Sequence, residues 1–448
     1  MTNLADLRSL AGRLDLKRIA ALAKHVDLAK LIGIFSELEP EDLAHLASQV
    51  RARHHKKALP EAHGDFYGLG ELLSPEELEI KLRVRDFMRR EIAPIVNDFW
   101  LRGEFPMKVI PGFAALDIAG LTFKGYGFPG RSCVLEGLVA EEIARVDVSM
   151  STFFGVQAGL AMGSIYLCGS DEQKRMYLPK MRRFELLGAF GLTEPEVGSG
   201  AAGGLTTTCR RDGDSWVLNG KKKWIGNATF SDFTIVWARD EADDQVKGFI
   251  VDRATQGFDP KKIEDKMALR IVQNAEITMT DCRMPETKRL QNATTFKDTA
   301  NVLRATRAGV AWQAVGCARG AYEHTVKYVQ ERRQFGRPIG SFQMVQDLVA
   351  HMLSQLTAMQ TMVYRLSQMQ DEGKLRDEHA SLAKVFCTSG SREVVSQARE
   401  LHGGNGILLS YDVARFVADS EALYSYEGTK QINSLIVGRA VTGFSAFV

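Results

Sequence analysis

The chain has 448 residues, of which 45% are hydrophobic and 25% charged, and its formal net charge is +2. This composition is ordinary for a folded protein of two or three domains, and a charge so near zero gives no field that would attract nucleic acid or an anionic membrane. The six cysteines form no C-x-x-C pair and have no metal-ligand spacing with the nine histidines. We therefore expect free thiols in a reducing compartment and no metal site.

Residues 1–66 are predicted to form an appended helical extension. The segment is amphipathic and mildly basic at its start, but Asp6, Asp15 and Asp27 are unusual for an organellar transit peptide. No apolar run approaches the length of a bilayer span, and the final AFV is no peroxisomal signal. We expect a cytoplasmic protein without a transmembrane segment. Three roles fit the extension: a partner-docking arm, a membrane-surface helix, or an arm folded onto its own domain.

Residues 67–187 are predicted to form a helical domain. Ser74 is a candidate N-cap, Pro75 follows at the first helical position, and two glutamates lie in the first turn. The helical pattern continues to about Phe184 and is interrupted by the glycine-rich stretch KGYGFPG.

The pattern then changes to short β runs over residues 188–292, which are VLNGKKKWIG, FTIVWAR, GFIVD and AEITMT. Such runs between glycine and aspartate turns predict a small antiparallel barrel. Residues 293–448 are helical again, and the methionines of SFQMVQDLVAHMLSQLTAMQTMVYRLSQMQ are expected to fill a core. This segregation predicts an α+β protein of separate layers, not one doubly wound sheet.

The stretch GSGAAG within LTEPEVGSGAAGG fits the glycine pattern of a dinucleotide-binding loop. That pattern has meaning only where a strand leads into it and a helix leaves it. After Gly204, two β runs flank an Arg-Asp-Gly-Asp turn, which predicts a hairpin. The glycines therefore need another explanation.

Five separated stretches carry a family resemblance: GLTEPEVGSG, KKWIGN, ERRQFGRPIGSFQ, LHGGNGI and YEGTKQI. In this order, they resemble the acyl-CoA dehydrogenase and oxidase family from about Gly68 to Phe447. The closest likeness is to plant-type short-chain acyl-CoA oxidases and to the glutaryl-CoA dehydrogenase branch. The resemblance implies an N-terminal helical domain, a middle antiparallel β-barrel and a C-terminal four-helix bundle.

The resemblance also implies an FAD-dependent α,β-dehydrogenation of a short- to medium-chain acyl-CoA to trans-2-enoyl-CoA. Glu427 in YEGT resembles the family's catalytic base. Locally, Tyr426 would desolvate the carboxylate and Gly428 would let the thioester approach. Without the resemblance, a glutamate before Gly-Thr is a solvated loop or helix-start residue. Some relatives have the base at the position that matches Thr306 here, just before Arg307. Threonine cannot accept the proton.

On the flavin side of the implied FAD site, the LTEP segment passes its N–H groups and the Thr193 hydroxyl along the pyrimidine edge. Trp224 resembles the tryptophan that packs on the flavin, although a tryptophan in a β run is otherwise a core residue. The family usually has Asp where Gly200 stands, and most dehydrogenases have Thr at Gly226, which leaves the electron acceptor open between electron-transfer flavoprotein and oxygen. The implied set is Phe190, Leu192, Thr193, Ser199, Trp224, Ile225 and Gly226.

The other half of the FAD site comes from a neighbouring subunit in this family. Read singly, ERR is a solvated charge run and GGNG a helix C-cap. The resemblance implies a homodimer or tetramer, because a monomer could not complete the site. The matching residues are Arg332, Gln334, Phe335, Gln343, Gly403, Gly404, Asn405, Gly406, Thr429 and Gln431.

The glutaryl-CoA branch has an arginine that pairs with the second carboxylate of the substrate, and Ser151 stands in its place here. We therefore expect an uncharged acyl chain. Met150, Phe153 and Phe154 fit either a length-limited tunnel or a helix core. The alternatives are an acyl-CoA oxidase, a decarboxylating glutaryl-CoA dehydrogenase and, outside the enzymes, an FAD-containing scaffold. The implied substrate contacts are Ser151, Ser199, Arg307, Tyr426 and Gly428.

Overall fold

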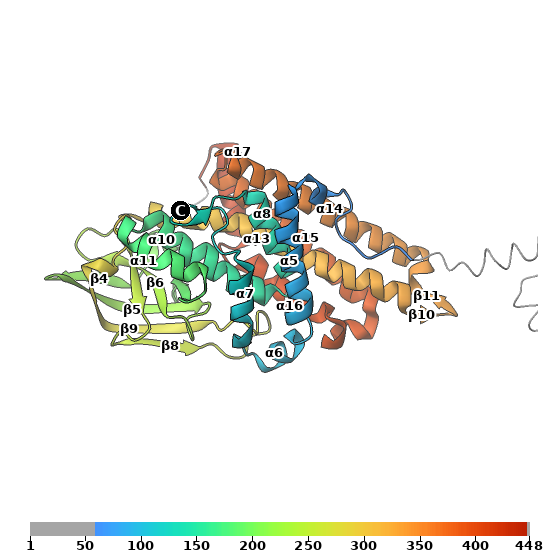
Figure 1. Cartoon of the computed structure of the whole chain (residues 1–448), viewed down its shortest axis with the longest axis horizontal. Helices are drawn as coiled ribbons and strands as arrows, with labels where there is room; N and C mark the ends of the chain where they lie inside the picture. The colour runs from blue at the N-terminus through green and yellow to red at the C-terminus, as the bar shows by residue number, and fades with distance from the viewer. Residues whose placement is uncertain (1–58, 446–448) are drawn as a thin grey trace, which may run out of the picture. The chain divides into compact units, whose positions relative to one another are not determined.

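The computed structural model describes residues 59–445 of the chain. The chain divides between residues 61 and 62, and the described residues belong almost wholly to the second of the two units. The prediction for the N-terminal extension lies almost wholly outside the described residues. Within the second unit, helices come first, then a curled sheet, then a bundle of long helices (Figure 1). The α+β architecture predicted from the sequence is confirmed.

The first helical part begins at a capped helix. The Ser74 hydroxyl accepts a hydrogen bond from the Glu77 N–H, and the Glu77 carboxylate accepts one from the Ser74 N–H. Such a capping box satisfies two backbone donors that would otherwise have no helical partner. A two-stranded hairpin, β1 (Lys124–Gly125) and β2 (Phe128–Pro129), occupies KGYGFPG. The helices are η1 (Leu69–Leu72), α5 (Pro75–Phe87), η2 (Met88–Ile92), α6 (Val96–Arg102), η3 (Met107–Val109), α7 (Ile110–Leu116), α8 (Cys133–Ala144), α9 (Val148–Phe154), η4 (Gly155–Ala161), α10 (Met162–Cys168) and α11 (Asp171–Arg182).

The stretch Val148–Cys168 corrects one expectation. We expected no apolar stretch long enough to cross a membrane, but this one could do so by length and composition. Within it, 72% of an 18-residue window is buried inside the protein. It comprises α9, η4 and α10, and η4 is a wide π-helical turn in the middle. A buried apolar helix of a folded core passes the same test, so the length of this stretch carries no further conclusion.

The middle layer is a seven-stranded sheet with the order β3-β6-β4-β5-β9-β8, and β7 also pairs with β6. Most pairs are antiparallel, as expected, but β3 and β4 both run parallel to β6. The predicted hairpin after Gly204 is β4–β5, preceded by a single helical turn, α12 (Ala201–Gly204). The strands are β3 (Gly188–Gly191), β4 (Thr208–Asp212), β5 (Ser215–Ile225), β6 (Phe233–Asp240), β7 (Val246–Asp252), β8 (Phe258–Lys262) and β9 (Ala275–Pro285), with η5 (Glu286–Lys288) after them.

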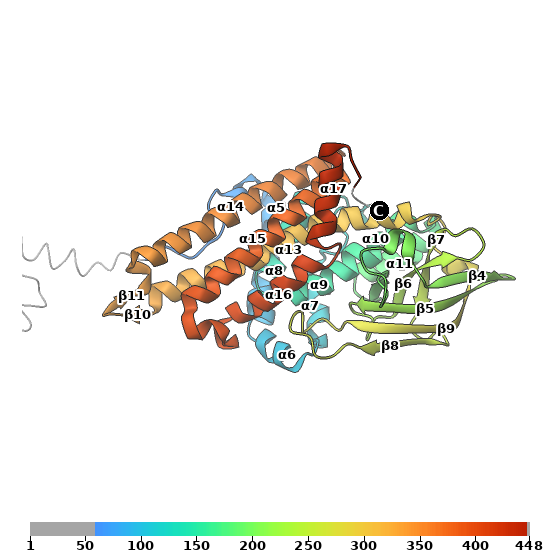
Figure 2. The same cartoon turned by 180° about the vertical axis from the view of Figure 1, so that it is seen from behind.

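The C-terminal part is built on three long helices, α13 (Phe296–Glu331), α14 (Gln343–Asp371) and α15 (Asp377–His402), which lie side by side in both views (Figure 2). The remaining elements are β10 (Arg333–Gln334), β11 (Arg337–Pro338), η6 (Ile339–Ser341), η7 (Gly403–Ile407), η8 (Leu409–Tyr411), α16 (Val413–Ser425) and α17 (Lys430–Thr442).

The methionines of α14 follow the core-filling prediction only in part. Met352 and Met359 are fully buried, but Met344 is 82% exposed. Met362 and Met369 line an apolar groove of about 930 Å³. The helix therefore has one face in the bundle and one face open on the described part of the chain.

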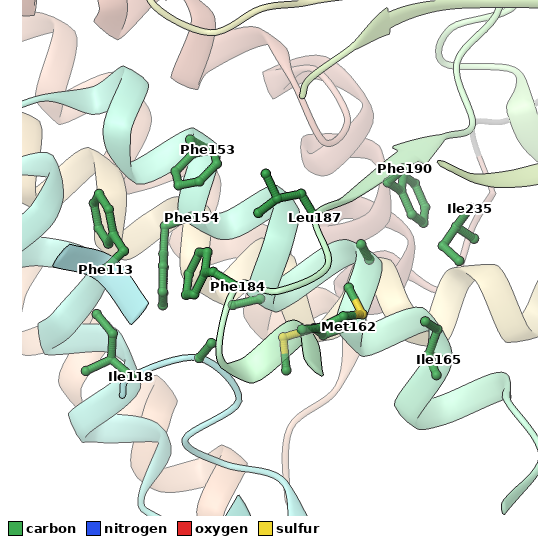
Figure 3. Packing of buried hydrophobic residues seen from close by; sticks show 14 of the residues in the cluster. Phe113, Ile118, Phe153, Phe154, Met162, Ile165, Phe184, Leu187, Phe190 and Ile235 are labelled. Carbon is green, nitrogen blue, oxygen red and sulfur yellow. The ribbon is translucent and has the colours of Figure 1, made fainter. Parts of the chain in front are cut away.

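An aromatic cluster fills the core under the first helices (Figure 3). Phe153 packs 4.5 Å from Phe105 and 5.8 Å from Phe113, measured between ring centroids. Phe154 packs 6.1 Å from Phe113. Met150, Phe153 and Phe154 are thus core residues, which is the second of the two interpretations that their spacing allowed.

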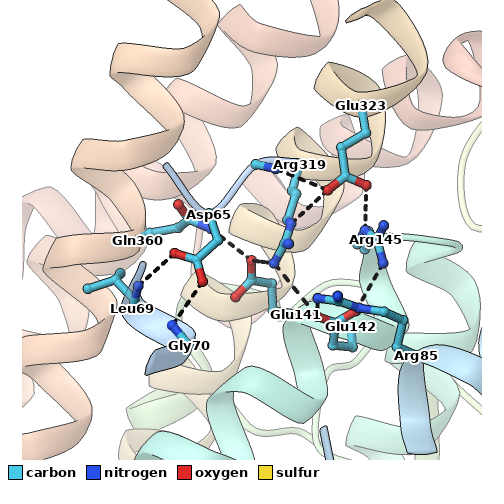
Figure 4. Close-up of polar contacts among 11 residues, drawn as sticks. Asp65, Leu69, Gly70, Arg85, Glu141, Glu142, Arg145, Arg319, Glu323 and Gln360 are labelled. Carbon is cyan, nitrogen blue, oxygen red and sulfur yellow. Dashed lines mark hydrogen bonds and ion pairs between the residues drawn. The ribbon is translucent and has the colours of Figure 1, made fainter. Parts of the chain in front are cut away.

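A buried charge network joins α5, α8 and α13 (Figure 4). The Arg319 guanidinium lies 2.9 Å from both Glu141 and Glu323. Glu142 is reached by Arg85 at 2.5 Å and by Arg145 at 3.1 Å. Such charges are stable away from water only when they are paired and hydrogen-bonded, and here each carboxylate has at least one cation.

Candidate active site

Glu427 lies in the short connection between α16 and α17. Its backbone is left-handed, with a φ of 52°, and Gly428 follows with a φ of 86°. Thr429 then caps α17, because its hydroxyl accepts a hydrogen bond from the Ile432 N–H at 3.3 Å. A left-handed conformation costs a residue other than glycine about 1–3 kcal/mol and persists only where the surroundings impose it. The fold therefore fixes the direction in which this carboxylate points.

The carboxylate of Glu427 has few partners. Its Oε2 accepts a hydrogen bond of 2.7 Å from the Thr306 hydroxyl of α13. Burial raises the pKa of Glu427 above its usual value, while this hydrogen bond and the charges of Arg307 and Lys384 pull it down. The net direction is upward, so the group binds a proton more readily than a solvated glutamate does.

The neighbouring Tyr426 forms a wall of the site. Its hydroxyl donates to Gln313 Oε1 at 2.6 Å, and Gln313 Nε2 donates to the Ser151 carbonyl at 3.2 Å. Burial raises the pKa of Tyr426, so its phenol stays protonated. Sequence reasoning missed Gln313, because one glutamine in a long helix has no distinguishing pattern.

The wide turn η4 connects the base to the loop after β5. A β-carbon on Gly159 would lie 3.3 Å from Thr306 Cγ2, and one on Gly226 would lie 3.2 Å from Val156 Cγ2. Both contacts involve η4, so Thr306, which holds Glu427, and Gly226 lie against the same helical turn. The structure thus brings together residues that are 201 positions apart in the chain, Gly226 and Glu427.

Trp224 differs from an ordinary strand tryptophan. It is 53% exposed and its backbone φ is 66°. Asn274 Nδ2 donates to the Trp224 carbonyl at 3.1 Å, and Lys266 Nζ in turn donates to Asn274 Oδ1 at 2.6 Å. A large ring held outside the core by a strained, hydrogen-bonded backbone is what stacking against a planar ligand requires. The core interpretation of this tryptophan is wrong.

The LTEP segment is anchored by an ion pair that the sequence analysis missed. Lys222 Nζ lies 2.8 Å from Glu194 Oε1 and 3.0 Å from the Leu192 carbonyl. Thr206 and Thr207 also donate to the Glu194 carboxylate. Lys222 and these donors hold the pKa of Glu194 at about 2, and burial lowers the pKa of Lys222 to about 8. The pair ties the LTEP segment to β5, and the Thr206 and Thr207 donors tie it to the chain that follows the glycine-rich turn.

The other flavin-side residues fall into two groups. Phe190, Leu192 and Ile225 are buried and support the loop from below, whereas Ser199 is exposed on the turn after it. Within residues 59–445, the Thr193 hydroxyl makes no hydrogen bond. That hydroxyl is therefore available to a ligand.

The part of the second predicted half-site around the β10–β11 hairpin lies at the other end of this unit. Arg332, Gln334 and Gln343 are exposed around the β10–β11 hairpin, and Phe335 is 92% exposed. In both views this hairpin is at the opposite end from β4 to β9 (Figures 1 and 2). The hairpin residues of the second half therefore do not meet the flavin-side residues within one chain, whereas Thr429 and Gln431 of that half follow Glu427 directly.

The glycine-rich turn has a local role as well. Gly403 ends α15 as its C-cap, as the alternative interpretation of GGNG had it. Asn405 Nδ2 donates to the Tyr328 hydroxyl at 3.0 Å, which ties this turn to the end of α13 near Arg332. Gly404 is exposed, Gly406 is buried against Arg399, and Gln431 is exposed at the start of α17.

The predicted substrate contacts are not all alike. Ser151 is buried, and its hydroxyl donates to the Ala140 carbonyl at 3.4 Å. Arg307 contributes charge next to Glu427, and its buried Nε has no hydrogen-bond partner among the described residues. Among those residues, no group of three or more His, Cys, Asp or Glu side chains is placed to hold a metal ion.

Comparison with known proteins decides the family. Models of the acyl-CoA dehydrogenase N-terminal, middle and C-terminal domains match residues 74–185, 189–282 and 296–442. The chain belongs to the acyl-CoA dehydrogenase family. It is therefore an oxidoreductase, and its cofactor is FAD.

Three relatives illustrate the range of this family. "Probable acyl-CoA dehydrogenase YngJ" of Bacillus subtilis is 32% identical over 82% of this chain and 98% of its own length. "Caffeyl-CoA reductase-Etf complex subunit CarC" of Acetobacterium woodii is 32% identical over 81% of this chain and 97% of its own. A glutaryl-CoA dehydrogenase of Mycobacterium smegmatis, solved in complex with FADH2, has a TM-score of 0.84 at 33% identity and covers 87% of this chain and 100% of its own.

The residues of this structure fit the flavin part of FAD. Trp224 presents an exposed ring, the Thr193 hydroxyl is unpaired within the described residues, and Gly226 adds no side chain beside them. These three groups belong to one rim of the sheet, at the ends of β3 and β5. This rim is the part of the acyl-CoA dehydrogenase that would hold the isoalloxazine ring.

Proposed function

We propose that this acyl-CoA dehydrogenase oxidises the Cα–Cβ bond of a short- to medium-chain acyl-CoA to give trans-2-enoyl-CoA, with Glu427 as the base. The observation that carries the proposal is the Glu427 carboxylate itself. It is directed by a strained backbone and accepts one hydroxyl hydrogen bond, from Thr306, which lies against the same helical turn as Gly226. A base with a raised pKa and an open lone pair is suited to taking a proton from carbon.

In this proposal, each side chain of the site has a separate task. Glu427 accepts the α proton and Thr306 orients the carboxylate through Oε2, which leaves Oε1 for the substrate. Tyr426, held by Gln313, excludes water from the carboxylate. FAD held at the Trp224 rim would supply the acceptor for the β hydrogen and its electron pair, and the electron pair of the Cα–H bond, whose proton goes to Glu427, would form the new double bond.

The expected substrate is an uncharged acyl chain. Ser151 offers no cation, and its hydroxyl is used by Ala140. An unpaired carboxylate in an apolar pocket is costly, so a dicarboxylyl-CoA should bind poorly. The similarity to a glutaryl-CoA dehydrogenase keeps a decarboxylating enzyme as the second candidate, in which Arg307 would take the role of the missing cation.

The electron acceptor in this proposal is electron-transfer flavoprotein or oxygen. The relative named as a subunit of a caffeyl-CoA reductase–Etf complex supports electron-transfer flavoprotein as the acceptor. The same name, a reductase, keeps the reverse direction, reduction of an enoyl-CoA, as a variant of this chemistry. Gly226 supports oxygen, since glycine shields the flavin edge less than threonine does.

We also propose a homodimer or tetramer in the cytoplasm. The Trp224 rim and the Arg332–Gln343 hairpin are far apart within one chain. In this proposal one FAD contacts both sets of residues, so the hairpin must come from a second subunit. The cytoplasmic location stays a prediction from the sequence.

The deciding experiment is an anaerobic titration of the purified yellow protein with hexanoyl-CoA. Bleaching of the flavin absorbance, with enoyl-CoA recovered in equal amount, is the expected result. A flavin that no acyl-CoA of any length reduces would contradict the proposal and would favour an FAD-containing scaffold.

A further inference from the structure

Lys384 is a buried cation that the proposed reaction does not use directly. It lies on α15 and is 0% exposed. Within residues 59–445 its ammonium makes one hydrogen bond, of 2.8 Å, to the carbonyl of Gly428. Burying a lysine is unfavourable unless its charge finds a partner, so its presence here needs an explanation beyond packing.

The carbonyl that Lys384 holds belongs to the turn carrying the base. Gly428 O accepts a second hydrogen bond of 2.8 Å from Asn433 Nδ2, so two buried donors converge on one oxygen. This clamp acts on the peptide next to Glu427, whose φ of 52° requires support from its surroundings. Lys384 is thus placed to maintain the strained turn.

The charge of Lys384 also acts on the carboxylate. The charged groups that interact with Glu427 are Arg307 from α13 and Lys384 from α15, and the Thr306 hydroxyl is its hydrogen-bond donor. Burial lowers the pKa of Lys384 to about 8, and Glu427 opposes that lowering. At pH 7 the ammonium is therefore mostly charged and favours the ionised form of the base.

We propose that Lys384 is a positioning residue for the base: it holds the Gly428 carbonyl so that Glu427 keeps its direction, and its charge keeps Glu427 ionised. The inference rests on the proposed role of Glu427. It differs from a packing role because it requires the charge as well as the hydrogen bond.

Three substitutions separate these contributions. Lys384→Arg keeps both the charge and a donor, Lys384→Gln keeps a donor without the charge, and Lys384→Met keeps neither. The proton on Glu427 is followed by difference infrared titration of its carboxylic C=O band, which is assigned by its loss in Glu427→Gln. This measurement needs no substrate, so it does not depend on turnover.

The midpoint of the Glu427 titration should rise by about 1 pH unit or more in Lys384→Gln and Lys384→Met, because removal of a nearby positive charge disfavours the carboxylate. Lys384→Arg should return it toward the wild-type value. The pH profile of anaerobic flavin reduction should move by the same amount. A midpoint in Lys384→Gln equal to that of the wild type would overturn the proposal. If Lys384→Met does not fold, the comparison of Lys384→Gln with Lys384→Arg is sufficient for the test.

The two proposals fail in different ways. A wild-type protein that no acyl-CoA reduces, but whose infrared midpoint depends on the charge at position 384, would contradict the proposed function and support the role of Lys384. Normal flavin reduction, with an infrared midpoint that does not depend on that charge, would support the proposed function and contradict the role of Lys384.

Discussion

Helix α13 passes through two buried polar regions of opposite character. At Arg319 and Glu323 the helix joins the charge network. Thr306, which bonds the base, lies thirteen residues earlier, about 20 Å away at 1.5 Å per residue. In the network, Glu142 is fully buried yet three arginines lower its pKa to about 2. Glu427 has one hydroxyl donor and two cations without a hydrogen bond to it, and its pKa is raised.

This difference shows that burial alone does not determine the chemistry of a carboxylate. Desolvation raises the pKa of both groups, and the number of directly bonded cations decides which way the balance falls. A carboxylate that is bonded directly to several cations stabilises the fold. A carboxylate with few hydrogen-bond partners remains able to accept a proton. Substitutions should therefore affect stability in the first region and activity in the second.

Glu427→Gln should show the largest effect on activity. Flavin reduction by acyl-CoA should fall by at least ~10²–10⁴, the range typical of a positioned base, because the amide cannot accept the α proton. The control is Glu421→Gln on α16, which removes an ion pair with Arg392 of α15. Single-turnover reduction near the wild-type rate would exclude Glu427 as the base.

The same variant should retain FAD and lose no stability. Because the folded-state pKa of Glu427 is raised, its contribution to stability declines as pH rises from the unfolded value through the folded one, and glutamine removes that decline. Urea unfolding at pH 7 is the measurement. A marked loss of stability would place Glu427 with the structural carboxylates instead.

Arg319→Met should give the opposite pattern. It takes from Glu141 the arginine that pairs with it, leaves Glu323 with Arg145, and should cost about 3–5 kcal/mol of unfolding free energy, as measured by urea unfolding. The rate of flavin reduction per folded, FAD-loaded protein should stay within a few-fold of the wild type. Arg365→Met, which removes only an exposed pair with Glu372, is the control and should cost little.

The pH dependence of stability sharpens the same contrast. The folded pKa of Glu142 is depressed to about 2, so its contribution is present above the unfolded value and is lost as pH falls from about 4.5 toward 2. Unfolding curves between pH 5 and 2 should show this loss in the wild type and a shallower one in Glu142→Gln. Equal slopes in the two proteins would mean that the network does not hold this carboxylate ionised.

Substrate charge tests whether the site contains a cation for a second carboxylate. Hexanoyl-CoA should be preferred to glutaryl-CoA by roughly 10²-fold or more in kcat/KM, without decarboxylation, because Ser151 cannot pair with the diacid. A preference for glutaryl-CoA would assign the missing role to Arg307. Loss of that preference in Arg307→Gln would then establish the correction.

Arg332→Ala should weaken FAD binding by roughly tenfold and weaken the oligomer with it, since a charge-assisted hydrogen bond to the cofactor of a neighbouring subunit would be lost. Arg333→Ala, an exposed arginine on the same hairpin, is the matched control. Flavin retention on dilution and sedimentation velocity together give the answer. Stoichiometric FAD at unchanged affinity would contradict the shared site.

Gly226→Thr should have the smallest effect, a few-fold fall in oxygen consumption relative to turnover with an artificial acceptor. A β-carbon there would lie 3.2 Å from Val156 Cγ2, so threonine should be introduced together with Val156→Ala. Val156→Ala alone is the control. Oxygen reactivity that is negligible in the wild type would instead place electron-transfer flavoprotein as the acceptor.

Several features of the fold follow from neighbours in the sequence. Ser74 with Glu77 starts α5, the Arg-Asp-Gly-Asp turn closes β4–β5, and the period change near residue 188 separates sheet from helices. Each depends on interactions within a few residues, which a sequence displays directly. The parallel pairing of β3 and β4 with β6 was not predictable in this way, because it joins strands that are distant in the chain.

The sequence by itself determined the family, the cofactor and the candidate base, because YEGT and four other short stretches keep their order along the chain. Only the tertiary structure decided what surrounds that base. Lys384, Thr306 and Gln313 reach the Tyr426–Gly428 turn from two other helices. No periodicity marks a single lysine or glutamine for such a role, and the pKa of Glu427 depends on the burial and the charges that packing alone brings together.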